Sequence, residues 1–560
     1  MVASTQDRPR RGRFCSTRWS VRLAGGVLLV TFALPAGSAA ATPAAATARA
    51  EVTATSFTAF LDGHGAPGPA HLRELAQRFY AERRGRPAWL GRDDRPTKAA
   101  RALVETLSDA ARHGLDPATY DTARLADLLA APPAGEAAYD FEVRLTAAFL
   151  LFAAHLAHGR AATGSRWPSP PRRSDLVAAL ADAARSGRPD RALDRLAPSR
   201  EASRRLTAAL ADYREIAADG GWGEVPDGET LKEGEAVAPE RYEALIARLA
   251  LTADLSADTA RELGVHPPGV PGRRGIGSWF RRPPPPEAGA GEPRLYDERL
   301  AEAVRHFQRR HGLTVDGVVG PATLAALNVP VERRIETLAL NLERWRWLAD
   351  DLGDLHVLVD IGGQELVAYE QGRPALRMNV VVGTATTPTP PIASEIEYLV
   401  ANPSWYVPTS ILRNEIEPRL ARDPGYLKRN GYERLPNGGV RQRPGPGNAL
   451  GQLKFIFPNE HSVYLHDTPS RHLFDHSTRA YSHGCVRIAE PRALAEWLLA
   501  GQEELALLDR FLEQGVERRV DLERKVAVHL LYWTASVGTG GEVRFHRDVY
   551  GRDAPLRASL

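Results

Sequence analysis

The spacing of apolar positions changes near residue 355 of the chain. Before that point apolar residues recur three to four apart, as in Leu72, Leu75 and Phe79, which is the period of one helix face. The stretch "FEVRLTAAFLLFAAHL" at 141–156 is apolar on almost all sides and predicts a buried helix. After residue 355, runs such as "LHVLVDI" and "ELVAYE" alternate between apolar and polar residues and predict β-strands. The pattern therefore predicts a multidomain α+β protein with a helical N-terminal part and a mostly-β C-terminal part.

Composition divides the chain into smaller segments. A basic leader, an apolar run over 23–34 and small residues near Ser38 have the order of a secretory signal peptide. The apolar run is shorter than the roughly 20 residues that span a bilayer, although an uncleaved leader would tether the protein to the inner membrane. The expected segments are a signal peptide (1–40), a disordered segment (41–55), a helical scaffold (56–268), a Pro/Gly-rich linker or loop (269–292), a small helical domain (293–330), a connecting helix (331–354), a mostly-β domain (355–550) with an insert at about 414–452, and a tail (551–560).

The small helical domain contains "YDERLAEAVRHFQRRHGLTVDGVVGPATLAALNV" at 296–329. Gly312 lies where a helix cap is expected, Asp316-Gly317 is a turn signal, and Pro321 suits the first turn of a second helix. The segment resembles the peptidoglycan-binding domain of cell-wall enzymes. The matching positions are Phe307, Gln308, Gly312, Leu313, Asp316, Gly317, Gly320, Thr323 and Leu327. The alternative is a small helical spacer.

Net charge and cysteine content limit which classes of protein the chain can belong to. The 560 residues carry a formal net charge of +3, which gives no support for a nucleic-acid-binding protein. The two cysteines are Cys15, inside the leader, and Cys485. An exported mature protein would thus hold one thiol, which excludes a disulfide framework. That thiol is either a buried apolar residue or a working nucleophile.

The residues around Cys485 favour a nucleophile. In "SVYLHD" strand alternation puts His466 on the polar face, and Cys485 follows nineteen residues later in "SHGC". An imidazole can accept the thiol proton and stabilise the thiolate, so we assign Cys485 as nucleophile and His466 as base. Gly484 permits an unusual φ, and the amides of Gly484 and Cys485 are the candidate oxyanion donors. His483 is the competing base and a candidate for orienting the site.

The string His466, Ser482, His483, Gly484, Cys485, Val486, Arg487 resembles the signature of the L,D-transpeptidases, which have a YkuD-type catalytic domain. "YLHDTP" at 464–469, "NPSWYVP" at 402–408 and "PGPGNALGQLKF" at 444–455 are similar to the large multidomain periplasmic members. By this resemblance Ser482 and Arg487 support the site, Tyr464 and Trp405 contact the substrate, and the insert occupies the place of a substrate-capping subdomain.

The resemblance implies a cell-wall enzyme of the periplasm or cell envelope. It would attack a tetrapeptide donor stem after residue three, release D-Ala, and pass the acyl group from Cys485 to the amine of an acceptor stem in a 3→3 cross-link. Such enzymes are generally acylated by carbapenems, and no cofactor or metal is implied. A zinc site is a poor match because structural zinc favours several thiolates. The alternatives are an L,D-carboxypeptidase or endopeptidase using the same pair, or a non-catalytic wall-binding protein.

Overall fold

The computed structural model describes residues 69–132, 134–161, 172–265 and 294–560. The expected signal peptide, the 41–55 segment and the 269–292 linker all lie outside these ranges.

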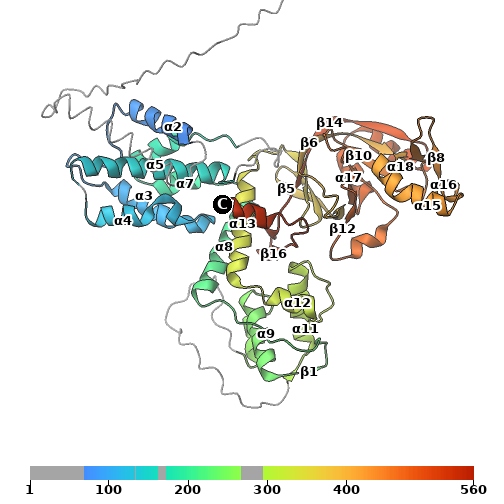
Figure 1. Cartoon of the computed structure of the whole chain (residues 1–560), viewed down its shortest axis with the longest axis horizontal. Coiled ribbons are helices and arrows are strands. Elements are labelled where there is room, and N and C mark those ends of the chain that lie inside the picture. The colour runs from blue at the N-terminus through green and yellow to red at the C-terminus, as the bar shows by residue number, and fades with distance from the viewer. Residues whose placement is uncertain (1–68, 133, 162–171, 266–293) are drawn as a thin grey trace, which may run out of the picture.

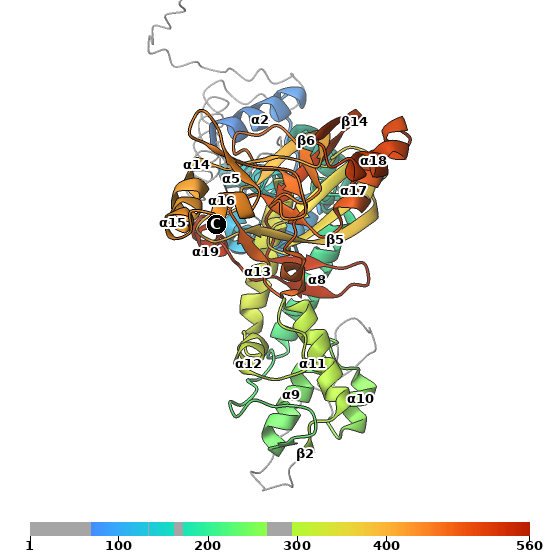
Figure 2. The same cartoon turned by 90° about the vertical axis from the view of Figure 1, so that its right-hand side faces the viewer.

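Three lobes extend from a pair of helices that pack against each other, α8 (Glu201–Ala218) and α13 (Val331–Arg346). Figure 1 shows an N-terminal helical lobe on one side, a sheet lobe on the other, and a smaller helical lobe below them. The turned view of Figure 2 also shows this smaller lobe separate from the other two.

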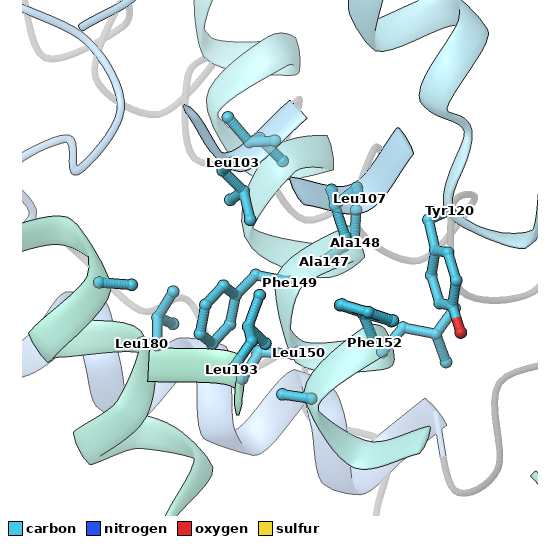
Figure 3. Packing of buried hydrophobic residues seen from close by; sticks show 14 of the residues in the cluster. Leu103, Leu107, Tyr120, Ala147, Ala148, Phe149, Leu150, Phe152, Leu180 and Leu193 are labelled. Atoms are coloured by element: carbon cyan, nitrogen blue, oxygen red, sulfur yellow. The ribbon is translucent and has the colours of Figure 1, made fainter. Parts of the chain in front are cut away.

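The N-terminal lobe is built around the buried helix that the sequence predicts, α5 (Glu136–His158). Figure 3 shows Phe149 and Phe152 of this helix packed among leucines of the neighbouring helices. Within the described ranges α5 is the one helix long and apolar enough to cross a membrane, but its most apolar window is 89% buried inside the protein. It is therefore a core helix here. The helices around it are α2 (Pro69–Glu82), α3 (Lys98–Ser108), α4 (Thr122–Ala130), α6 (Leu176–Ser186) and α7 (Pro189–Asp194).

The smaller lobe contains the two helices of the expected hairpin, α11 (Glu298–Arg310) and α12 (Pro321–Leu327). Gln308 explains the spacing of the motif between them. Its side-chain oxygen accepts the amides of Asp316 and Gly317, and its Nε2 donates to Thr323. One buried amide thus fixes the turn and the start of the second helix.

The core of this lobe also includes residues 225–263, which the sequence grouped with the preceding scaffold. These residues include α9 (Pro239–Leu251) and α10 (Ala257–Glu262), and a short ribbon pairs β1 (Ala236–Val237) with β2 (Arg294–Leu295). Two short helices alone have little area with which to bury an apolar face, so α9 and α10 complete the core.

Polar residues of α13 join the lobes. Buried Glu343 accepts the backbone amides of Arg160 and Ala161, which follow α5, at 2.5 and 2.9 Å. On the other side Asn341 and Arg344 donate to Thr534 of the sheet lobe at 2.9 and 3.0 Å. Because a buried polar group is costly to leave unpaired, these contacts fix both neighbours relative to α13.

The sheet lobe confirms the mostly-β prediction. Its nine-stranded sheet has the order β12-β5-β13-β11-β10-β6-β14-β3-β4, and a further β4–β5 pairing closes the sheet on itself. The strands are β3 (Leu355–Asp360), β4 (Glu365–Glu370), β5 (Arg373–Gly383), β6 (Ile392–Ala401), β10 (Leu453–Ile456), β11 (Leu465–His466), β12 (Ala480–Ser482), β13 (Val486–Ile488) and β14 (Arg518–Leu531). Helices α17 (Pro491–Leu498) and α18 (Glu503–Glu513) add apolar residues to its core.

The C-terminal end adds two elements beside α13. A hairpin, β15 (Ala535–Val537) with β16 (Val543–Phe545), packs in one core with α8 and α13. The segment 551–560 includes α19 (Asp553–Ala558), whose Asp553 pairs with Arg344 at 2.6 Å.

The insert of the sheet lobe has a small core of its own. Strands β7 (Trp405–Tyr406), β8 (Tyr432–Arg434) and β9 (Val440–Gln442) form a sheet in the order β7-β9-β8. Between β7 and β8 lie α14 (Thr409–Ile411), the π-helical turn η4 (Leu412–Ile416), α15 (Glu417–Arg422) and α16 (Tyr426–Arg429). The core residues are Val407, Leu412, Ile416 and Val440. In Figure 1 this unit lies at the outer end of the sheet lobe, far from α13.

Candidate active site

The predicted pair lies on two neighbouring parallel strands, since His466 ends β11 and Cys485 directly precedes β13. In β11 and β13 Leu465 is opposite Val486, and both side chains are fully buried in the sheet core. Since successive side chains of a strand point to opposite faces, His466 and Cys485 lie on the other face. The ladder continues past the strand ends, because the Val486 amide donates to the Tyr464 carbonyl at 3.1 Å. The register thus brings Cys485 beside Tyr464, one step along from His466.

Two cations share this face. Arg487 is the register partner of His466 in β13, and Lys454 of β10 is its partner on the opposite side. The Lys454 ammonium lies 4.0 Å from the centre of the Tyr464 ring. Arg487 was among the predicted residues, whereas Lys454 was missed. Its alternation with buried Phe455 gives its face, but only the pairing of β10 with β11 brings it to His466.

Cys485 is partly exposed, and its sulfur lies 3.9 Å from the carbonyl of Ser462. Burial raises the pKa of the Cys485 thiol, and hydrogen bonds from the Tyr464 amide and hydroxyl lower it to a smaller extent. The thiol therefore stays protonated in the resting protein.

His466 is buried, with 5% of its surface exposed, and its Nδ1 lies 2.5 Å from the Asp467 carbonyl. A carbonyl can only accept, so Nδ1 carries the proton and Nε2 is left as an acceptor. Burial lowers the pKa of His466 to about 3, with further contributions from the charges of Arg487 and Lys454. We therefore expect a thiol and a neutral imidazole in the resting protein, because burial disfavours both charged forms. A neutral imidazole is the form that can act as the base predicted from the sequence.

A hydrogen-bonded turn presents Cys485. The Ser482 hydroxyl donates to the Cys485 carbonyl at 2.5 Å and accepts the Gly484 amide at 3.1 Å. Gly484 has φ +113°, a conformation that favours glycine, and Thr389 donates to its carbonyl at 2.8 Å. Because the Gly484 amide is engaged by Ser482, the resting turn does not offer it as an oxyanion donor. Thr389 had no signal in the sequence, since its loop approaches the turn only in the folded sheet.

His483, the competing base, points to the insert. Its Nε2 lies 2.6 Å from Glu415 in η4, and both side chains are partly exposed. This contact joins the cysteine turn to the insert. Glu415 could not be found from the sequence, because it lies 68 residues away in a segment without a periodic pattern.

Tyr464 and Trp405 also lie together. The partly exposed Tyr464 lies beside the Trp405 side chain, and burial raises the pKa of Tyr464 well above the usual value. Trp405 packs in turn near Tyr432 of the insert, with ring centres 6.3 Å apart. The aromatic residues therefore form one edge of the region around Cys485.

No group of three or more histidine, cysteine or acidic side chains close enough to hold a metal ion is found in the described part of the chain.

Comparisons with known proteins match three parts of the chain. Residues 354–508 match the family model YkuD, the L,D-transpeptidase catalytic domain. Residues 74–210 match a scaffold domain, and 290–327 match a domain described as a "putative peptidoglycan binding domain". The sheet lobe thus contains a YkuD-type L,D-transpeptidase catalytic domain. The same chain also contains a scaffold domain and a peptidoglycan-binding domain.

The relatives cover only parts of the chain. A protein of Haemophilus influenzae described as a "putative L,D-transpeptidase" is 32% identical over 243 residues, which are 40% of this chain and 49% of that protein. The chain therefore spans about half the length of this curated relative. An L,D-transpeptidase structure from Stackebrandtia nassauensis is 15% identical with a TM-score of 0.20, covering 55% of this chain and 97% of that one. One from Xylanimonas cellulosilytica is 17% identical with a TM-score of 0.19, covering 55% and 99%.

Proposed function

We propose that the protein is an exported L,D-transpeptidase that forms 3→3 peptidoglycan cross-links through a thioester on Cys485. The observation that carries the proposal is the shared sheet face of Cys485 and His466. It is supported by the match of this lobe to a transpeptidase domain and by the peptidoglycan-binding domain of the same chain. Donor and acceptor would both be stem peptides of the wall, met in the periplasm or cell envelope.

In the first half-reaction the Cys485 sulfur attacks the carbonyl carbon of donor residue three. His466 Nε2 takes the thiol proton as the carbon–sulfur bond forms, and the developing oxyanion faces the Cys485 amide and the Tyr464 hydroxyl. The carbon–nitrogen bond then breaks, and the imidazolium returns the proton to the leaving D-Ala amine. The charged form of His466 exists only transiently, which fits its low pKa.

In the second half-reaction an acceptor amine attacks the thioester. His466 accepts the proton from the attacking nitrogen, the sulfur leaves as a thiolate, and that proton restores the thiol. Atoms and charge balance over the cycle, with one amide exchanged for another and D-Ala released. Ser482 and Gly484 position the sulfur, and Trp405 lies beside Tyr464.

The test is the incubation of the purified full-length protein with disaccharide-tetrapeptides, followed by mass spectrometry of the products. The proposal expects dimers with a 3→3 bond, and a carbapenem adduct on Cys485. Cys485→Ala should abolish both while leaving sedimentation with cell walls largely intact. Tripeptides without dimers would instead identify an L,D-carboxypeptidase, in which water resolves the same thioester. Absence of both products and of the adduct would leave a wall-binding protein, and dimers from Cys485→Ala would refute the mechanism.

A further inference from the structure

Two cations, Lys454 and Arg487, lie beside Cys485 on one face of the sheet. Lys454 and Arg487 are both partly buried, and burial lowers the pKa of each. Within the described residues neither forms an ion pair with a carboxylate, although the charge of Glu517 acts on Lys454 from a longer distance. Lys525 of the same sheet, in contrast, is more exposed but pairs with Glu397 at 2.5 Å. Because partly buried charges are usually paired, two unpaired cations on one face indicate a site for an anion supplied from outside.

The register places these cations on both sides of His466. Arg487, His466 and Lys454 form one row across three adjacent strands, and Cys485 and Tyr464 form the neighbouring row. The Lys454 ammonium leans from its own row over the Tyr464 ring. Its charge acts on both the Cys485 sulfur and the His466 imidazole. A molecule that reacts with the sulfur therefore lies within the field of this ammonium.

We propose that Lys454 is a specificity-determining residue that binds a carboxylate of the donor stem. The inference rests on the proposed function. A tetrapeptide donor ends one residue beyond the bond that is cleaved, so its free carboxylate lies within one residue length, about 3.5 Å of chain, of the attacked carbonyl. The side-chain carboxylate of residue three is the other source of the same chemistry. The long, flexible side chain of Lys454 can reach either carboxylate, and its compact ammonium group offers three hydrogen-bond donors.

The first experiment needs no turnover. Iodoacetate and iodoacetamide both alkylate a thiol by displacing iodide, but only iodoacetate carries a carboxylate. We measure both rates on Cys485 by peptide mass spectrometry, in the full-length protein and in the same protein unfolded in urea. The folded protein should favour iodoacetate by about tenfold relative to the unfolded chain, the effect of one charge-assisted contact.

Variants of Lys454 distinguish an effect of its charge from an effect of its packing in the fold. Lys454→Met should lose most of this preference, with only a smaller fall in the iodoacetamide rate because the ammonium also lowers the pKa of Cys485. Lys454→Arg should keep the preference. Lys525→Met is the matched control and should behave like the wild type. An unchanged preference in Lys454→Met would overturn the proposal, as would an equal loss of both rates, because that loss would indicate a structural role.

The second experiment identifies the carboxylate. Three donors are compared: the disaccharide-tetrapeptide, its C-terminal amide, and the same stem with the side-chain carboxylate of residue three amidated. One of the two amides should lower kcat/KM about tenfold, mainly through KM, and Lys454→Met should remove that discrimination. If Lys454→Met still discriminates against the same amide as strongly, the proposal is wrong. Absence of turnover with all three donors would refute the proposed function, while the alkylation preference would still test the carboxylate site.

Discussion

The charge state of the Cys485–His466 pair leads to a prediction that separates two kinds of cysteine enzyme. Enzymes with a resting thiolate–imidazolium pair hold the thiol pKa at about 3.5–7.5. Here burial raises the pKa of Cys485 above its usual range of about 8.5, and it lowers that of His466 to about 3. We therefore expect no thiolate at neutral pH in the free protein.

Burial raises the pKa of Cys485 and lowers that of His466 to about 3, so both shifts oppose moving the proton from the sulfur to the imidazole at rest. A turnover of one per second corresponds to a barrier of about 17 kcal/mol, so a neutral resting pair is compatible with catalysis.

The assay is the rate of Cys485 alkylation by iodoacetamide as a function of pH, with the ultraviolet absorbance of the thiolate measured in parallel against Cys485→Ala. The rate should rise continuously from about pH 7 to beyond pH 9, because the thiolate fraction grows until pH exceeds the raised pKa of Cys485. His466→Ala should be slower near pH 7 and approach the wild type at high pH, where hydroxide ionises the thiol without a base. A plateau between about pH 5 and 8, or thiolate absorbance in that range, would refute the reasoning.

Two further predictions concern the turn and the insert. Gly484→Ala should lower the free energy of unfolding by about 1–3 kcal/mol and strongly reduce turnover, because φ +113° is strained for alanine even though the added Cβ would lie 3.8 Å from the nearest atom. The control is Gly541→Ala, also at positive φ in an open turn, which should lower stability and leave turnover unchanged. Equal losses of activity in the two variants would contradict the role of the turn. Glu415→Gln should raise KM two- to fivefold, because a partly exposed contact between a carboxylate and an imidazole is worth about 0.5–1 kcal/mol. Glu417→Gln, an exposed neighbour in the insert, is the control, and equal KM values for both variants would show that the pair with His483 does not hold the insert.

The parts of the site that lie on one strand could be predicted from the sequence. Alternation gave the face of His466 in "SVYLHD", and the short "SHGC" turn gave Cys485, because both are local patterns. The contacts of Lys454 and Glu415 could not be predicted, since they depend on which strands pair and on where the insert folds back. The resting charge state could not be predicted from residue types, because the pKa values depend on burial, which the sequence shows only in outline.

The fold was predicted to a similar extent. The spacing of apolar residues, three to four apart in helices and alternating in strands, distinguished the helical lobes from the sheet lobe. The motif at 296–329 predicted the α11–α12 hairpin. The inclusion of residues 225–263 in the same core was not predicted, because their helical pattern resembles that of the scaffold before them. Periodicity shows that a helix has an apolar face but does not show which partner covers it.

The junction of the lobes connects the peptidoglycan-binding domain with the sheet lobe that holds Cys485. Arg310 of the peptidoglycan-binding lobe donates to the Val543 carbonyl in the β15–β16 hairpin at 2.6 Å, and His311 stacks on Phe545 of the same hairpin. That hairpin shares one core with α13, whose buried polar side chains also hold the catalytic sheet through Thr534. A wall strand bound to the small lobe would therefore be held in a set direction relative to the active site. Binding in this orientation would raise the local concentration of stem peptides near the sulfur, as expected when two binding sites of one molecule engage the same polymer.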